Sequence, residues 1–149
     1  MTTTELENDI YKRLRKLGTY LCFEVGMPSL NTYQLSRERV DLLSYDTKGN
    51  WRFYELKVSV NDFKSKAKKS FYGNYNYYVM PKEIYEKVKH EIPKHIGVYT
   101  EYGCEKQSKR QELEKYSHND LLFALMQGLY REYNKSINMA IKMYDYEVI

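Results

Sequence analysis

The stretch from Arg39 to Val58, RVDLLSYDTKGNWRFYELKV, decides the fold of this chain. Its two ends, Val40–Tyr45 and Trp51–Val58, are rich in aromatic and branched residues, which favour β-strands. Between them, Lys48-Gly49-Asn50 is a strong turn signal. The sequence therefore predicts a β-hairpin with an acidic residue on each of its two strands.

The hairpin permits Asp41, early in the first strand, and Glu55, late in the second, to face each other. Two carboxylates held that close repel each other unless a divalent cation or a lysine lies between them. Lys57 follows Glu55 by two residues and therefore points to the same side of its strand. A metal site is one interpretation, and a cross-strand charge cluster at a sheet edge is the other. The cost of unpaired charges among apolar neighbours favours the metal site.

The elements around the hairpin predict one α/β domain spanning residues 1–149. Leu6, Ile10, Leu14 and Leu17 have helical spacing, Thr4 and Glu7 form a capping-box pattern, and Gly18 ends the helix. The other expected elements are a strand at 19–25, a loop at 27–38, a helix at 59–72, strands at 75–80 and 96–100, a helix at 82–90, a loop or extended segment at 102–116, and a helix from 117. This order predicts a mixed central sheet flanked by helices.

Composition indicates the general class of protein but says little about its function. The chain has 149 residues, seventeen tyrosines and a net charge of only +4, so overall charge is a weak argument for a polyanionic partner. The lysine run at positions 64, 66, 68 and 69 fits a solvated face and a nucleic-acid face equally well. Two cysteines, the lack of a signal-peptide pattern and the lack of a long apolar run predict a soluble, cytoplasmic protein without membrane contact.

Over residues 5–101 the sequence resembles the PD-(D/E)xK nuclease superfamily and, within it, the small MmcB-like DNA-repair proteins. The residues that carry the resemblance are Arg39-Val40-Asp41, Glu55-Leu56-Lys57-Val58-Ser59, Asn61-Asp62-Phe63, Lys68 or Lys69, Tyr72, and Tyr77-Tyr78-Val79-Met80-Pro81. The resemblance implies a restriction-endonuclease-like αβββαβ core at about residues 4–101. A C-terminal helical extension at about 117–149 lies outside it.

The resemblance also implies a set of functional residues. Asp41, Glu55 and the Leu56 carbonyl would bind Mg²⁺ or Mn²⁺, and Lys57 would orient the attacking water or stabilise developing charge. The family's additional glutamate corresponds best to Glu24, with Glu5 and Glu7 as the other candidates. The residues that would contact DNA are Lys64, Lys68, Lys69 and Tyr72. Two departures are Val40, where the family usually has proline, and Lys68, where some members have glutamine four residues before the tyrosine.

Three functional hypotheses follow. The leading one is a Mg²⁺-dependent DNA nuclease or DNA-repair protein. The alternative is a non-catalytic DNA-binding or adaptor protein that retains the nuclease fold. The third is a protein that oligomerises through the apolar face of residues 121–130, and it is compatible with a homodimer that pairs through the C-terminal helices in either of the other cases.

Overall fold

The computed structural model describes residues 1–29, 35–65 and 70–148, and at 35–37 and 146–148 it describes the backbone alone. In the described part of the chain the elements are α1 (Thr3–Leu14), β1 (Thr19–Pro28), β2 (Leu35–Asp46), β3 (Trp51–Leu56), α2 (Val60–Lys64), β4 (Tyr75–Val79), α3 (Lys82–Val88), a 3₁₀ turn (Lys89–Glu91), β5 (Gly97–Thr100), β6 (Gly103–Lys106) and α4 (His118–Val148). The first six elements have the predicted order αβββαβ.

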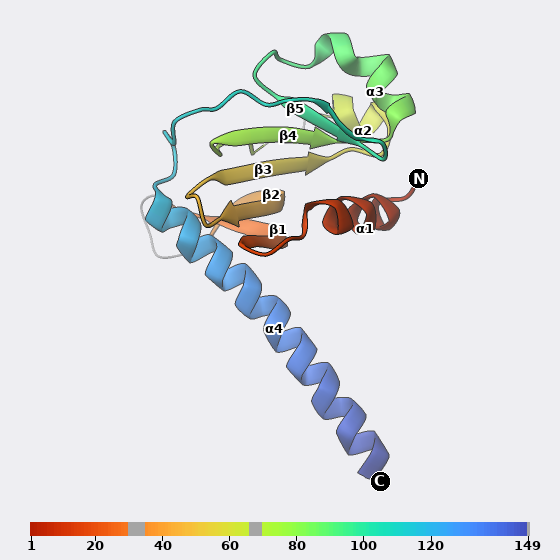
Figure 1. The fold of residues 1–149 in the computed structure, drawn as a ribbon. Coiled ribbons are helices and arrows are strands. Elements are labelled where there is room, and N and C mark those ends of the chain that lie inside the picture. Colours follow the sequence, from red (N-terminus) through yellow and green to blue (C-terminus); the bar gives the residue numbers. More distant parts are fainter. Residues whose placement is uncertain (30–34, 66–69, 149) are drawn as a thin grey trace.

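These strands form one mixed sheet in the order β1-β2-β3-β4-β5-β6 (Figure 1). The strands β1, β2 and β3 pair antiparallel, β3, β4 and β5 pair parallel, and β6 returns antiparallel to β5. The predicted α/β class and mixed central sheet are therefore confirmed. No helix among the described residues is long and apolar enough to cross a membrane.

Strand β3 shows how the two faces of the sheet are covered. Trp51 and Phe53 pack in a cluster with Leu121, Ala124 and Leu125 of α4. The alternate residues Tyr54 and Leu56 pack in a second cluster with Leu6 and Ile10 of α1. A third cluster places residues of α2 and α3 against Tyr78, Met80 and Val98. Because side chains alternate along a strand, α1 covers one face, while α4 and the α2–α3 pair cover different parts of the other.

The hairpin turn forms as the sequence predicts. The Asp46 carboxylate accepts hydrogen bonds from the backbone N–H groups of Lys48 at 2.9 Å and Asn50 at 3.1 Å. Gly49 has a φ of 87°, a left-handed conformation that glycine adopts without steric cost. This turn fixes the register that places Leu42 opposite Tyr54.

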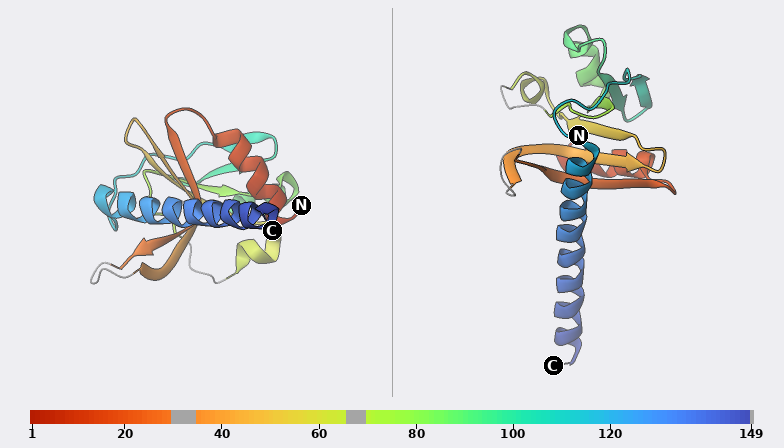
Figure 2. Two further views of the ribbon diagram at one scale, coloured as in Figure 1. Left: turned by 90° about the horizontal axis from the view of Figure 1, so that it is seen from below. Right: turned by 90° about the vertical axis from the view of Figure 1, so that its left-hand side faces the viewer.

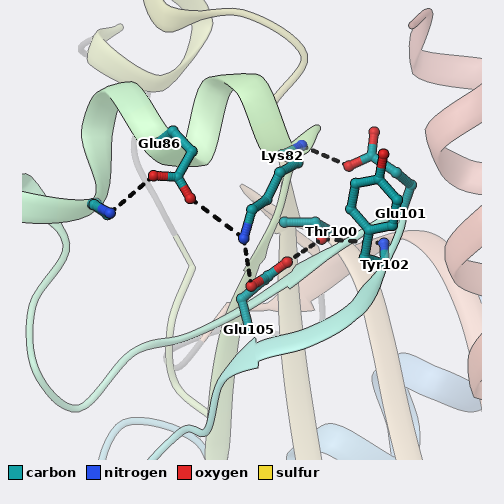
Figure 3. A network of polar contacts seen from close by, with 7 residues as sticks. Lys82, Glu86, Thr100, Glu101, Tyr102 and Glu105 are labelled. Atoms are coloured by element: carbon teal, nitrogen blue, oxygen red, sulfur yellow. Dashed lines mark hydrogen bonds and ion pairs between the residues drawn. The ribbon is translucent and has the colours of Figure 1, made fainter.

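Helix α3 begins without a side-chain cap of its own, because Pro81 holds the capping position. The Glu101 carboxylate, from the connection between β5 and β6, accepts the Lys82 backbone N–H at 2.6 Å (Figure 3). The Lys82 ammonium group donates to Glu105 at 2.8 Å, and the Thr100 hydroxyl donates to the same carboxylate at 2.9 Å. This network ties α3 to the β5–β6 hairpin.

The N-terminal third departs from the prediction in two ways. The capping box uses Thr2 and Glu5, not Thr4 and Glu7, and the helix ends at Leu14, which leaves Leu17 fully exposed. The chain needs residues 15–18 to turn into β1, and the Gly18 carbonyl accepts the Thr47 N–H at 2.9 Å. Much of the predicted loop at 27–38 is strand, because β1 continues to Pro28 and β2 begins at Leu35.

The predicted helix at 59–72 is wrong at Ser65 and at 70–72, which are not helical, since α2 ends at Lys64. Residues 66–69 of the predicted helix lie outside the described residues. The backbone N–H of Ser70 donates to the Glu55 carboxylate at 3.2 Å, so it is not available for a helical hydrogen bond. The segment predicted as loop or extended at 102–116 contains the short strand β6, which agrees with that prediction. The departure at 70 depends on a contact between distant parts of the sequence.

Helix α4 is 31 residues long and projects well beyond the sheet (Figures 1 and 2). Its first turns pack on β1, where Gly128 allows close approach: a Cβ there would lie 2.9 Å from the Cys22 sulfur. The residues at 132–145 are all exposed. The C-terminal helical extension is therefore confirmed, and most of it lies outside the core.

Candidate functional site

The sheet register aligns three acidic residues on adjacent strands. Phe23 of β1 pairs with Leu42 of β2, which pairs with Tyr54 of β3. One residue further along, the same register places Glu24, Asp41 and Glu55 side by side. We call these three residues the carboxylate row. Glu55 in turn pairs with Tyr78 of β4, so the row crosses the sheet from its edge to its centre.

Asp41 and Glu55 form the closest pair in the row. Glu55 is only 5% exposed, and its carboxyl group is near enough to the Asp41 carboxyl to share a proton with it. Burial first, and then the Asp41 charge, raise the pKa of Glu55 to about 9. Asp41 also accepts the Leu56 backbone N–H at 2.8 Å. The structure thus brings together the two predicted carboxylates, and the Leu56 group that it places against Asp41 is the N–H, not the carbonyl predicted as a metal ligand.

Glu24 lies at the exposed end of the carboxylate row, on the edge strand. Its φ of 54° is unusual for a residue with a side chain. The Arg131 guanidinium, from α4, donates to the carbonyls of Phe23 and Glu24, each at 2.9 Å, and so supports this backbone. Partial burial, followed by the Asp41 charge, raises the pKa of Glu24 above its ordinary value. Of the predicted glutamates, Glu24 is thus the one near Asp41, whereas Glu5 caps α1.

Lys57 lies on the same side as Glu55 and is only 6% exposed. Its Nζ atom is 3.8 Å from the Asp62 carboxylate, and its charge opposes, as a smaller effect, the increase in the pKa of Glu55. Asp62 also accepts the Val58 N–H at 3.1 Å and donates its own N–H to the Ser59 hydroxyl. Asp62 therefore stabilises the start of α2 and lies within ion-pair distance of the lysine amine.

The inner end of the carboxylate row lies on the sheet face that two clusters of the core share. Glu55 and Lys57 follow Phe53 at intervals of two residues, so they share the face that carries α4 on one side and the α2–α3 pair on the other. Ser70 contacts Glu55 on this face: it is fully buried, its N–H donates to Glu55, and its hydroxyl donates to the Arg39 carbonyl at 3.0 Å. Sequence reasoning missed Ser70, since no motif or periodicity singles it out.

The predicted nucleic-acid contacts are only partly described. Lys64 is exposed, with its Nζ atom 3.9 Å from Glu91. Tyr72 is half-buried and packs edge-on against Phe53, with the Lys115 ammonium 4.5 Å from its ring centre. Lys68 and Lys69 lie outside the described residues. The expected helical face shared by positions 68 and 72 is wrong, because Tyr72 does not belong to a helix.

The donor set suits a hard divalent cation. In the described part of the chain, no group of three or more histidine, cysteine, aspartate or glutamate side chains is arranged to bind a metal ion. The Asp41–Glu55 pair remains, and it offers only oxygen ligands, which Mg²⁺ and Mn²⁺ prefer. A buried carboxyl group whose pKa is raised beside a second carboxyl group also fits a site where a cation replaces its proton.

Comparison with known proteins defines the fold and leaves the family open. No protein-family model matches the chain, and no curated protein matches it. A solved structure described as the SPO1766 protein of unknown function from Silicibacter pomeroyi is similar, with a TM-score of 0.66 over 86% of each chain and 18% identity. At this identity the likeness shows a shared fold alone.

Proposed function

We propose that the protein is a Mg²⁺- or Mn²⁺-dependent DNA nuclease of the PD-(D/E)xK type. The observation that carries the proposal is the convergence of Asp41, Glu55 and Lys57 at the end of β3. The order αβββαβ, in which this superfamily places its acidic residues and lysine, supports the proposal. The fold alone does not define an activity, so the weight rests on these side chains.

Phosphodiester hydrolysis brings negative charge next to a group that is already negative. A divalent ion held by Asp41, Glu55 and the Leu56 carbonyl would polarise the phosphate and lower the pKa of a bound water. Lys57 supplies a fixed positive charge on the same face, and Asp62 keeps the amine from moving away. Glu24, with its raised pKa, is placed to accept a proton at the solvent end of the row.

The test is cleavage of end-labelled DNA, duplex and single-stranded, with labelled RNA in parallel, in Mg²⁺, in Mn²⁺ and with a chelator. Asp41→Asn and Lys57→Met keep side-chain volume and should each reduce the rate by about 10²-fold or more. Lys94→Met, at an exposed position outside the site, is the matched control and should cleave normally. Cleavage that persists in both site variants would disprove the proposal.

The alternative, a non-catalytic DNA-binding or adaptor protein with the same fold, has one observation in its favour. Glu55 and Lys57 are almost fully buried, and Ser70 lies over Glu55. Under this alternative the protein binds DNA with an affinity that falls with salt, Glu55→Gln leaves that affinity unchanged, and none of the metals supports cleavage.

A further inference from the structure

The exposed part of α4 carries apolar residues at a regular spacing. Starting at Phe123 they recur at intervals of three and four residues, which is the pattern of positions a and d in a coiled coil. We call this set the apolar seam: Phe123, Met126, Tyr130, Tyr133, Ile137, Ala140 and Tyr144. Tyr130 and Tyr144 are 64% and 66% exposed, so the seam faces solvent in the single chain. It covers three heptads, or about 32 Å of helix.

The seam is not an extension of the protein's own core. The residues of α4 that pack on β1 are Leu121, Ala124, Leu125 and Gly128. Continuing that row along the helix leads to Arg131, Lys135 and Lys142, which are charged, and to the exposed Met139. Where α4 leaves the sheet, its sheet-side face thus becomes mainly polar, while the seam continues on the other side. A face built this way needs a cover from outside the chain.

The residues that flank the seam identify the kind of partner. At the positions equivalent to e and g the chain has Leu122, Gln127, Leu129, Asn134, Ser136, Ile141 and Met143, none of them charged. Two copies of this helix can therefore pair without like charges meeting across the interface. The charged residues of the same stretch, Arg131, Glu132, Lys135, Lys142 and Asp145, all lie at b, c or f, away from such a partner.

A lipid surface fits this helix less well. Interfacial membrane helices have a polar face rich in lysine and arginine. The polar face of this helix has only three basic residues, at 131, 135 and 142, and it also has two acidic residues, at 132 and 145.

We propose that the protein is a homodimer in which the apolar seams of two α4 helices pair as a short coiled coil. The dimer would bury tyrosine and methionine side chains that are otherwise exposed, while the two globular parts remain separate from the seam. This inference does not depend on the proposed nuclease activity.

The experiment is sedimentation equilibrium or light scattering on the full chain over a range of concentrations. We expect a species of twice the 18.0 kDa monomer mass. Ile137→Glu places a carboxylate in the seam and should raise the dissociation constant of the dimer at least about tenfold. Asn138→Glu introduces the same side chain one residue along, outside the seam, and should leave the dimer intact.

Both positions lie in the exposed part of α4, so neither change disturbs the core, which circular dichroism and thermal unfolding verify. A wild-type protein that stays monomeric at every concentration overturns the proposal. The same holds if Ile137→Glu and Asn138→Glu weaken the dimer equally. Binding of neutral or anionic lipid vesicles that Ile137→Glu abolishes, without dimer formation, would identify a membrane surface as the partner instead.

Discussion

Replacing Glu55 by glutamine is expected to stabilise the metal-free protein at neutral pH. Glutamine has the same shape, its oxygen can accept the Ser70 N–H, and its amide can donate to Asp41 in place of the shared proton. The substitution removes the free-energy cost of burying the Glu55 carboxyl group next to that of Asp41. A residue that weakens the fold in this way is expected where function requires it.

The magnitude follows from linkage between protonation and folding. Glu55 has an ordinary pKa of 4.5 and a folded-state pKa raised to about 9. Below pH 4.5 both states are protonated and the cost vanishes, whereas between pH 4.5 and 9 it grows by about 1.4 kcal/mol per pH unit. At pH 7 the upper limit is about 3 kcal/mol. Relaxation around the coupled pair reduces this, and we expect a gain of about 1–3 kcal/mol.

The assay is urea unfolding of wild type and Glu55→Gln with a chelator present, at pH 4.5, 6 and 8. The two free energies of unfolding should agree at pH 4.5 and diverge as pH rises, with the variant the more stable. The control Glu112→Gln lies at an exposed position and should show no pH-dependent difference. A difference that stays constant with pH, or a variant that is less stable at pH 8, would refute the reasoning.

Three other predictions follow from the structure. Mg²⁺ or Mn²⁺ should raise the melting temperature of the wild type but not of Glu55→Gln, as scanning calorimetry would show; equal shifts in both would exclude this site. Arg131→Ala should lower the free energy of unfolding by about 1–3 kcal/mol, because two β1 carbonyls lose a charged donor, while Lys142→Ala should change it by less than about 0.5 kcal/mol. Gly128→Ala should destabilise the protein by about 1–3 kcal/mol in urea unfolding, because the alanine Cβ would lie 2.9 Å from the Cys22 sulfur. Alanine favours helices over glycine, so a stabilised variant would show that α4 can shift to make room for it.

The convergence of Asp41, Glu55 and Lys57 was predictable because it depends on local rules. A hairpin turn fixes the register, and strand parity then fixes which side chains share a face. The position of Glu24 could not be predicted from local rules, because it follows from the pairing of β1 with β2. The family resemblance pointed to it, and the register explains why it lies beside Asp41.

The failures came from contacts that no local pattern contains. The spacing of Phe63 and Phe71 predicts one continuous helix, yet both pack against Tyr78 while the helix ends at Lys64. The backbone N–H of Ser70 donates to the buried Glu55 carboxyl group instead of to a helical carbonyl. This contact joins residues fifteen positions apart, so no local spacing could have predicted it.

Several features that lower the stability of the fold occur together at the carboxylate row. Glu24 adopts a left-handed backbone conformation, which costs a residue with a side chain about 1–2 kcal/mol. Glu55 is buried beside a second acid, and Arg131 must reach from α4 to support the β1 backbone at the same point. An apolar residue in place of Glu55 would remove the cost of the buried carboxyl pair. Because the costs coincide on adjacent strands, the simplest explanation is a site selected for what its oxygen atoms bind, and that explanation fails if Glu55→Gln changes neither metal binding nor activity.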